Sequence, residues 1–420
     1  MSELIDNRAY RLRMLKDVIR GLHRGGSPEA AKAKLKELVG HTDAAEIASM
    51  EQELIAEGTP VEEVRSMCDT HAQVLREIMA PPARPEWPPG HPADTLLREN
   101  EALRGPIGRM KAAVEQLRQL PPGAPPGPLQ LAMRQASNDL MDVDKHYQRK
   151  ENLLFARLEQ HGITGPSKVM WAKDDEARQL LKRVARVLAQ PDLSAQELLE
   201  LADTTIEPAL EAVEGMIFKE ENILLPMALS TLSDEDWAAI WHDSPRYGWC
   251  LVEPREGYQP QAPADPAPPA EVPAERTLAF ATGHLTLEQL QGIFSALPVD
   301  LTFVDADDRV RFFSESAKRV FVRSKTILGR KVQHCHPPGS VHVVEQILAD
   351  FRTGRRDVAE FWIHFHGKFV HIRYFAVRGA GRQYLGTLEV TQDLTPLRAL
   401  EGERRLLQDA PDPRADPVAR

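Results

Sequence analysis

The sequence contains two similar segments, KENLLFARLE at residues 150–159 and EENILLPMAL at residues 220–229. Both combine carboxylates with apolar residues at helical spacing, and the 70 positions between equivalent residues leave room for one further helix. This arrangement predicts a helical bundle in which alternate helices are structurally equivalent. Carboxylates and histidines that point inward at matching heights of a bundle can hold metal ions. The identical pairs are Glu151 and Glu221, Asn152 and Asn222, and Leu154 and Leu224.

The composition limits the class of protein. The 420 residues are 42% hydrophobic, so the chain can form several cores, and we expect three domains. A net charge of -10 argues against a nucleic-acid or anionic-membrane partner, because binding to phosphates requires a basic surface. No apolar run is long enough to span a membrane, the N-terminus has no signal-peptide core, and the cysteines form no CxxC pair. These features predict a cytoplasmic protein.

Proline-rich segments divide the chain. The segment PPARPEWPPGHP at residues 81–92 is typical of a stiff linker, and residues 254–273 form a longer segment of disordered composition. We therefore expect a multidomain α plus α+β protein. Its predicted parts are a small helical domain at residues 2–80, a helical bundle at 91–250, a linker at 251–279 and an α+β domain at 280–405.

The first part contains helix-start signals at Ser27, Thr42 and Pro60. His71 follows Cys68 at i+3 spacing, which could give half of a metal site. We favour a partly buried histidine in a short helix.

The patterns of the second part predict helices near residues 94–118, 130–160, 172–189 and 195–229. At roughly 100° per residue, Glu151 lies on the inward face of its helix and His146 lies at the edge of that face. Glu220 and Glu221 straddle the equivalent face of the last helix. These carboxylates could reach the interior, or they could be flank residues paired with neighbouring basic side chains, and both alternatives stay open.

The segments DKHYQRKENLLF, GITGPSKVMWAKDDEARQLL and FKEENILLPM together resemble the HHE-type hemerythrin-like domains. Those domains are four-helix bundles that bind a pair of iron ions, and the resemblance covers most of the second part. The N-terminal part and GHPADTLLREN at residues 90–100 resemble a bacterial domain of unknown function (domain of unknown function 438). It is found fused to such a bundle and to a C-terminal PAS domain.

The resemblance implies a histidine and, four residues later, a glutamate in the second and fourth helices, because such side chains share one helix face. Each copy here keeps half of that pair: Lys150 follows His146, and Met216 precedes Glu220. Asp174 stands where a histidine is usual. A site with five histidines cannot be assembled, but a carboxylate-rich site for one iron or manganese ion could be. Its candidate ligands are His91, His146, Glu151, Asp174 and Glu220. We favour the alternative, a degenerate bundle with a structural role.

The third part changes to a strand pattern. After a short amphipathic helix, residues 299–304 and 309–313 predict two strands joined by a turn. Helical residues follow, and then three strands near residues 359–365, 369–377 and 386–391. This order, with LPVDLTFVDADDRVRFFSE and the ending GTLEVTQDLTPLRALEGERRLL, resembles the PAS domains. The charged helix after QDLT resembles the exit helix through which PAS domains signal or dimerise.

Histidines are concentrated in this PAS-like part. The segment GRKVQHCHPPGSVHVVE at residues 329–345 lies where the helix that borders a PAS cavity should begin. Imidazole and thiolate side chains bind haem iron and other transition metals. The candidate cofactor ligands are His334, Cys335, His336 and His342. A cavity that holds a small molecule or stays empty, and a domain that only binds proteins, are the alternatives. The helix itself should pack one apolar face on the sheet: Val341, Val344, Ile347, Leu348 and Phe351.

Two functions are compatible with these patterns. The first is a non-catalytic sensory or regulatory protein that couples the bundle to the PAS module. It would signal redox, oxygen or metabolite status to a partner protein, with the exit helix offering a route to a homodimer. The second is a non-haem iron protein that acts on oxygen, peroxide or nitric oxide, as in iron-sulfur repair. No phosphate-binding loop, kinase motif or cyclase motif is present, so we favour the first. The cofactors in question are iron in the bundle and haem or a small ligand in the PAS domain.

Overall fold

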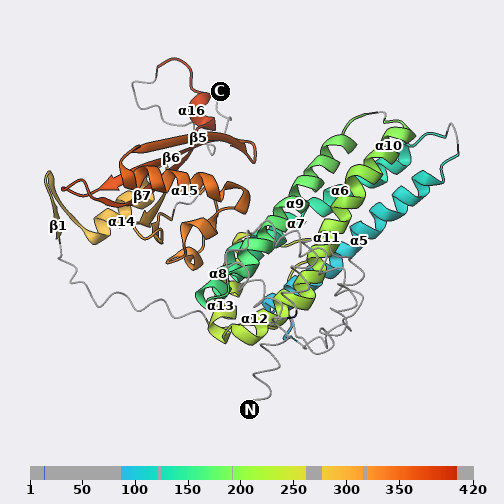
Figure 1. Ribbon diagram of the computed structural model, residues 1–420, viewed down its shortest axis with the longest axis horizontal. Coiled ribbons are helices and arrows are strands. Elements are labelled where there is room, and N and C mark those ends of the chain that lie inside the picture. The colour runs from blue at the N-terminus through green and yellow to red at the C-terminus, as the bar shows by residue number, and fades with distance from the viewer. Residues whose placement is uncertain are drawn as a thin grey trace, which may run out of the picture.

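The computed structural model in Figure 1 describes Met14 and residues 87–121, 124–191, 193–261, 277–315 and 319–403. Apart from Met14, the predicted N-terminal helical domain, with Cys68 and His71, lies outside these residues. The described residues form a helical part and a C-terminal part built on an antiparallel sheet. This confirms the predicted fold class for the second and third parts of the chain.

Four helical segments make up most of the helical part (Figure 1). The first is α5 (Pro92–Arg118). The second consists of α6 (Gly127–Met141), α7 (Val143–Arg149), the π-helical turn η1 (Lys150–Leu154) and α8 (Phe155–Gln160). The third is α9 (Gly165–Leu188). The fourth consists of α10 (Ala195–Leu201), the π-helical turn η2 (Ala202–Ile206), α11 (Glu207–Lys219), the π-helical turn η3 (Glu220–Leu224) and α12 (Leu225–Thr231). A further helix, α13 (Asp234–Asp243), packs against α5 and η1.

Local sequence explains where these helices start. Pro92 stands in the first turn of α5, where backbone N–H groups have no partner within the helix, so the missing N–H of proline costs no hydrogen bond. The His91 side chain accepts a hydrogen bond from the Ala93 N–H. α10 starts with a capping box formed by Ser194 and Glu197, in which each side chain bonds to the other's backbone N–H. These signals fix the ends of the helices, and packing fixes their arrangement.

The helices enclose one continuous hydrophobic core. α6 packs between α5 and α9, and α11 packs between α9 and α5, so the second and fourth segments lie diagonally across the bundle. Leu154 and Leu224, which are equivalent in the repeat, are each 1% exposed. The repeat therefore marks the inward faces of two segments of one bundle, and the structure shows that they are diagonal to each other and not neighbours.

The C-terminal part is a five-stranded antiparallel sheet with the strand order β4-β3-β7-β6-β5. The long helix α15 (Pro338–Thr353) packs against β7, and the short helix α14 (Leu287–Ala296) precedes the sheet. After the sheet comes a four-residue helix, α16 (Thr395–Arg398), where the exit helix was predicted. Residues 399–403 are not helical, so among the described residues the predicted exit helix is limited to these four residues. The strands are β3 (Asp300–Asp305), β4 (Val310–Phe313), β5 (Val358–Phe365), β6 (Lys368–Arg378) and β7 (Tyr384–Asp393). All five agree with the predicted strands to within a few residues.

The segment expected to be a linker at residues 251–279 is partly structured. Arg255 forms an ion pair with Asp94, and the Tyr258 N–H donates to the Pro89 carbonyl at 2.7 Å. The Tyr258 ring also meets the His91 ring edge-on, with centroids 4.7 Å apart. Residues 251–261 therefore pack on the bundle, because a few specific contacts outweigh the disorder that the composition indicates. In addition, a hairpin of β1 (Thr277–Phe280) and β2 (Gly283–Thr286) precedes α14.

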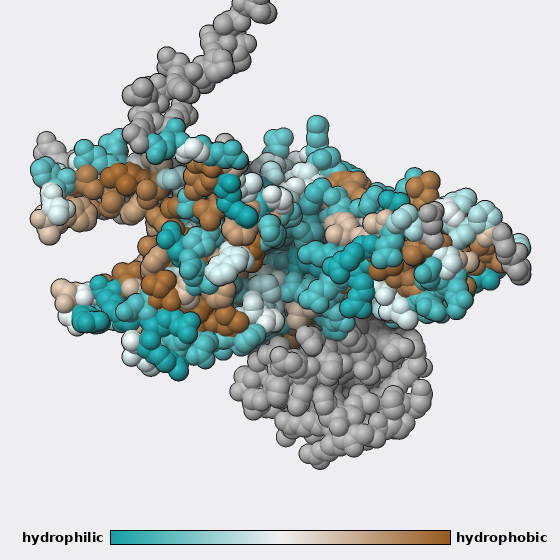
Figure 2. Space-filling model, turned by 90° about the horizontal axis from the view of Figure 1, so that it is seen from above, coloured by the Kyte–Doolittle hydropathy of each residue, from teal (hydrophilic) through white to brown (hydrophobic). Residues whose placement is uncertain are grey.

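Exposed apolar side chains gather on the C-terminal part. Among the described residues, all but two of the large exposed hydrophobic side chains follow residue 276, the exceptions being Leu131 and Leu251. Trp362 on β5 is 63% exposed. Figure 2 shows brown areas over this part of the molecule and a more hydrophilic bundle surface. No helix among the described residues combines the length and the apolar character of a membrane span.

Candidate functional site

The interior of the bundle contains a cluster of charged side chains that come from all four helical segments. Burial of a charge is costly unless an opposite charge and hydrogen bonds compensate for it, so such a cluster must be closely paired. Apart from Arg178, whose side chain is 12% exposed, each member is at most 4% exposed. The cluster consists of Glu99, His146, Arg149, Lys150, Glu151, Asp174, Arg178 and Glu220.

Lys150 lies at the centre of this ion cluster. Its Nζ donates a hydrogen bond to Asp174 Oδ1 at 2.7 Å and another to Glu220 Oε1. The ammonium also lies over the ring of Tyr147, 4.3 Å from the centroid. Burial alone would lower the pKa of Lys150, but the carboxylates of Asp174 and Glu220 outweigh burial and raise it. Lys150 is therefore a permanent cation in the middle of the bundle.

His146 bridges two carboxylates of the cluster. Its Nδ1 lies 2.8 Å from Glu99 Oε2, and its Nε2 lies 2.9 Å from Glu220 Oε2. Burial opposes protonation of His146, but Glu220 and Glu99 outweigh it and raise the pKa of the imidazole. Arg149 donates a further hydrogen bond to Glu99. The first, second and fourth segments are thus connected through a single imidazole ring.

The two repeat segments have the same backbone structure. Residues 150–154 and 220–224 both form π-helical turns, which are often found at functional sites in α-helices. In each turn an asparagine donates from Nδ2 to the backbone carbonyl four residues earlier at 2.8 Å: Asn152 to Gln148, and Asn222 to Phe218. The repeat is thus preserved as local geometry.

The glutamates of the two turns are also equivalent. Glu151 accepts two hydrogen bonds from Arg178, at 2.7 and 2.9 Å. Glu221 accepts two from Arg104, both at 3.0 Å. Both glutamates therefore pair with an arginine of another segment. Glu151 forms a bidentate pair through Nη1 and Nη2 of Arg178, whereas both oxygens of Glu221 accept from Nη2 of Arg104.

The charges of the ion cluster come close to balance. Its four carboxylates face three permanent cations, Arg149, Lys150 and Arg178. Burial raises the pKa of Asp174 well above its ordinary value, and the neighbouring carboxylates raise that of His146. One proton held by either of these groups makes the cluster neutral. The protein's own groups therefore nearly cancel the charge of the cluster, although Asp174 Oδ2 and Arg149 Nε have no hydrogen-bond partner among the described residues.

The C-terminal part contains a cavity of about 520 Å³ between α15 and the sheet. Apolar side chains dominate its wall, among them Val344, Ile347 and Leu348 of α15. This agrees with the predicted apolar face of the helix, although Val341 lines a neighbouring pocket instead. The polar residues of the wall are Arg323, Cys335, His336, Ser340, Tyr374, Thr387 and Glu389.

The polar groups of this cavity are not fully satisfied by one another. Arg323 Nη2 lies 3.9 Å from Glu389 Oε2, beyond hydrogen-bonding distance, and the buried Arg323 Nε has no hydrogen-bond partner among the described residues. Burial lowers the pKa of His336 to about 4 and raises the pKa of Tyr374. The cavity therefore offers one guanidinium, one carboxylate and neutral polar groups on an apolar wall.

Residues 323–336 form one wall of this cavity and also contact the bundle. Arg330 donates hydrogen bonds to both carboxylate oxygens of Glu159, and the two side chains are only 3% and 6% exposed. Thr326 Oγ1 donates to the backbone carbonyl of Asn152, in the turn η1, at 2.9 Å. Burial would raise the pKa of Glu159, but hydrogen bonds from His334 and Arg330 outweigh it and lower the pKa to about 2. One segment thus connects the cavity with the π-helical turn that carries Lys150.

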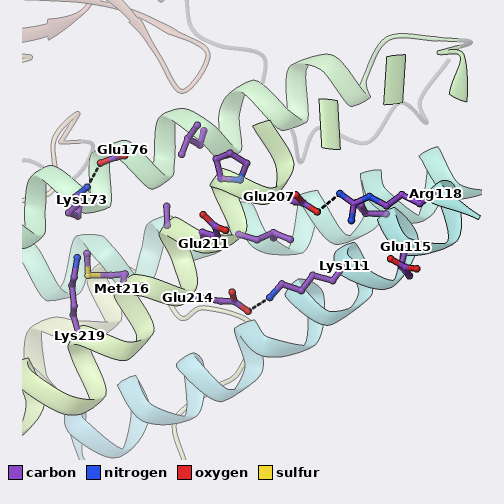
Figure 3. Close-up of a pocket in the computed structure, with 16 residues that line it drawn as sticks. Lys111, Glu115, Arg118, Lys173, Glu176, Glu207, Glu211, Glu214, Met216 and Lys219 are labelled. Atoms are coloured by element: carbon purple, nitrogen blue, oxygen red, sulfur yellow. Dashed lines mark hydrogen bonds and ion pairs between the residues drawn. The ribbon is translucent and has the colours of Figure 1, made fainter. Parts of the chain in front are cut away.

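A groove of about 900 Å³ lies on the outside of the bundle, between α5, α9 and α11 (Figure 3). Its charged side chains are largely paired: Lys111 with Glu214 at 2.6 Å, Arg118 with Glu207 at 2.7 Å, and Lys173 with Glu176 at 2.8 Å. Four basic and five acidic residues line the groove in total. This near balance gives the groove little preference for a ligand of either charge.

Comparisons with known proteins agree with this division of the chain. Residues 15–81 match the model of a family of unknown function (DUF438), residues 91–228 match the hemerythrin HHE cation binding domain, and residues 290–395 match a PAS domain. The chain joins a DUF438 region, a hemerythrin-like domain and a PAS domain. This order confirms the predicted architecture.

Two solved structures are similar to parts of the chain. The C-terminal domain of a protein from Streptococcus mutans is 34% identical over 30% of this chain and 99% of that one, with a TM-score of 0.29. The PAS domain of a protein from Colwellia psychrerythraea is 16% identical over 26% of this chain and 98% of that one, with a TM-score of 0.21. No curated protein matches the chain.

The residues of the hemerythrin-like domain do not fit the cation that its family description implies. The Lys150 ammonium lies between Asp174 and Glu220, where two carboxylates could otherwise share an ion. Within the part of the chain that the structure describes, no three His, Cys, Asp or Glu side chains are grouped so as to hold a metal ion. A like charge this close disfavours a bound cation at low dielectric.

The structure brings together most of the metal ligands proposed from the sequence. His146 and Glu220 are in direct contact, Asp174 is joined to Glu220 through Lys150, and Glu151 adjoins them in its pair with Arg178. His91 is elsewhere: it caps α5 and stacks on Trp87, with ring centroids 4.6 Å apart. Burial lowers the pKa of His91 to about 4, which keeps this stacked imidazole neutral.

The proposed PAS ligands divide between two pockets. Cys335 and His336 line the cavity, whereas His334 and His342 line a second pocket of about 520 Å³ beside it, which His336 also borders. Ser167 and Lys168 of the bundle line this second pocket too. His334 thus lies at the contact with the bundle, where its Nδ1 is 3.5 Å from Glu159 Oε2.

Several residues of both sites were not predicted from the sequence. Glu99 and Arg178 complete the ion cluster, and Arg323 and Glu389 provide the charged groups of the cavity. Glu99 could have been found as the one acidic residue on the apolar stripe of its helix, next to Leu96 and Leu103. The other three carry no local signal, because their partners are distant in the sequence.

Proposed function

We propose that the chain is a regulatory protein in which the PAS cavity binds a small, largely apolar molecule and the hemerythrin-like bundle receives the resulting change. The double role of residues 323–336 supports this proposal, since they line the cavity and contact the bundle. A ligand that displaces Cys335 or His336 would move Arg330 relative to Glu159. Small shifts of this kind are amplified where a packed interface has two discrete arrangements.

The wall of the cavity indicates the chemistry of the ligand. Its apolar residues suit a hydrocarbon or aromatic body, and Arg323 and Glu389 offer one donor and one acceptor at its edge. Of the four cofactor ligands proposed from the sequence, His336 is the only histidine on the cavity wall. Haem is therefore a less suitable occupant than a metabolite with a single polar edge.

The output of this sensor passes to a partner protein in our proposal. The exposed apolar side chains of the PAS domain, among them Trp362 and Leu397, form surface of the kind that protein partners cover. The segment after Asp393, which begins with α16 and the exposed Leu397, would provide a route to a homodimer. Because the cavity suits a metabolite better than haem, we propose metabolite status as the signal that the protein senses.

The proposal can be tested with the full-length chain and the fluorescent apolar anion 8-anilinonaphthalene-1-sulfonate as probe. The probe should bind, and Ile347→Trp, which fills the cavity, should remove most of the fluorescence gain. Ile293→Trp is the matched control, because it adds the same side chain at a position that is 43% exposed. Equal loss in both variants, or no loss in either, would show that the cavity is not the binding site.

Transmission to the bundle requires a second measurement. Hydrogen exchange of the backbone amides at residues 148–160 should change when the probe occupies the cavity. Arg330→Met should leave probe binding intact and remove this change, because it breaks the contact with Glu159. If occupation of the cavity leaves hydrogen exchange at these residues unchanged in the wild-type chain, the proposed coupling is refuted.

A titration with haem tests the identity of the ligand. A Soret shift that is lost in His336→Ala would identify haem as the ligand.

A further inference from the structure

We infer that the Lys150 ammonium replaces the metal ion of this bundle, and that Lys150→Glu converts the ion cluster into a site for a divalent transition metal. The inference does not depend on the proposed function of the PAS domain. It rests on three observations: the position of Lys150 in the repeat, the contacts of its ammonium, and the charges around it.

The repeat makes Lys150 the counterpart of Glu220. The two residues are 70 positions apart, each is the first residue of a π-helical turn, and both point into the bundle interior, where they are 1% and 2% exposed. The shared backbone geometry shows that a side chain at position 150 is aimed at the same region as Glu220 from the diagonal segment. A carboxylate at position 150 would therefore face the carboxylate of Glu220.

The Lys150 ammonium makes contacts that a metal cation would also make. Its Nζ bonds to Asp174 from α9 and to Glu220 from η3, and His146 contacts the second oxygen of the same Glu220 carboxylate. One imidazole and several carboxylates form a donor set that suits iron(II) or manganese(II). The ammonium thus occupies the point where the carboxylates of Asp174 and Glu220 meet, and His146 adjoins this point through Glu220.

The charge balance explains why the present chain should exclude a metal. Lys150 supplies one of the three permanent cations that face the four buried carboxylates, and one of the other two, Arg178, also pairs with the more exposed Asp144 and Asp175. A divalent ion would add uncompensated positive charge at low dielectric. Lys150→Glu changes the cluster by two negative charges, which is the charge that one divalent ion restores.

The experiment measures manganese(II) and iron(II) binding to the full-length chain under anaerobic conditions. The wild-type chain should retain almost no metal after dialysis, and its Tm should be the same with manganese(II) and with EDTA. Lys150→Glu should retain about one ion per chain, bind manganese(II) at least roughly tenfold more tightly than wild type, and show a Tm that rises with the metal. Lys182→Glu is the control for charge alone, because Lys182 is an exposed residue of α9.

Each result bears on the inference. Stoichiometric metal in the wild-type chain would overturn it, and so would a folded Lys150→Glu chain that binds no more metal than Lys182→Glu. Should Lys150→Glu fail to fold without metal, Lys150→Met decides the question, since it removes the ammonium and leaves His146, Asp174 and Glu220 in place. Its Tm should rise with manganese(II), and a Tm that does not respond would overturn the inference.

Discussion

Lys150 and Glu220 stand at equivalent positions of the 70-residue repeat and form an ion pair across the interior of the bundle. The resemblance to hemerythrin-like domains implies a carboxylate at both positions. In this chain one of the two is a cation, so the diagonal segments are joined directly. The stability of the bundle should therefore depend on Lys150 itself.

Lys150→Met should lower the free energy of unfolding by about 3–5 kcal/mol, because it leaves the buried carboxylates of Asp174 and Glu220 without their shared cation. Urea unfolding monitored by circular dichroism measures the change. Lys182→Met, on the exposed face of α9, should cost no more than about 0.5 kcal/mol. Equal effects of the two substitutions would show that the cluster does not depend on the ammonium.

The buried pair of Arg330 and Glu159 should stabilise the contact between the two domains. A double-mutant cycle with Arg330→Met and Glu159→Gln should give a coupling energy of about 1.5–3 kcal/mol, because both side chains are nearly inaccessible to water. The exposed pair of Lys111 and Glu214 is the matched control and should give about 0–1 kcal/mol. A coupling no larger than that of the control would mean that the domains do not rely on this contact.

His336 should make the stability of the PAS domain depend on pH. Its pKa is lowered by burial to about 4, so the folded state keeps it neutral where the unfolded state, with a pKa near 6.5, takes up a proton. The stability that depends on neutral His336 is complete above pH 6.5 and is lost as the pH falls towards 4. When the pH falls from 7.5 to 5, the free energy of unfolding of His336→Phe should therefore decrease by about 1–2 kcal/mol less than that of the wild-type chain. His342→Phe, at an exposed position, should behave like wild type in the same urea titrations.

Gly386 should be intolerant of a side chain. Its φ is 153°, and a Cβ there would lie 2.1 Å from the Val304 carbonyl oxygen of the neighbouring strand. Gly283 has a φ of 150° and nothing within 4 Å of the same position, so it shares the backbone conformation without the collision. In thermal unfolding, Gly386→Ala should lower the free energy of unfolding by about 1–3 kcal/mol more than Gly283→Ala does. Similar losses in both would show that backbone strain, not the collision with β3, sets the cost.

The sequence by itself determined the elements and their inward faces. Alternating apolar residues predicted the five strands of the PAS domain, and the spacing of Val344, Ile347 and Leu348 predicted the helix face that lines the cavity. The repeat around Leu154 and Leu224 predicted two equivalent segments of one bundle, and the structure placed them diagonally. These features are local, because side-chain periodicity is a direct consequence of helix and strand geometry.

Only the tertiary structure decided which charged side chains form ion pairs with one another. Glu151 and Glu221 are identical in the repeat, yet one pairs with Arg178, 27 positions later, and the other with Arg104, 117 positions earlier. Likewise, His91 proved to be a helix cap within an aromatic stack, and Lys150 proved to be the centre of the ion cluster. The physical reason is that ion pairs depend on distances between separate segments, and these distances are set by how the apolar faces pack.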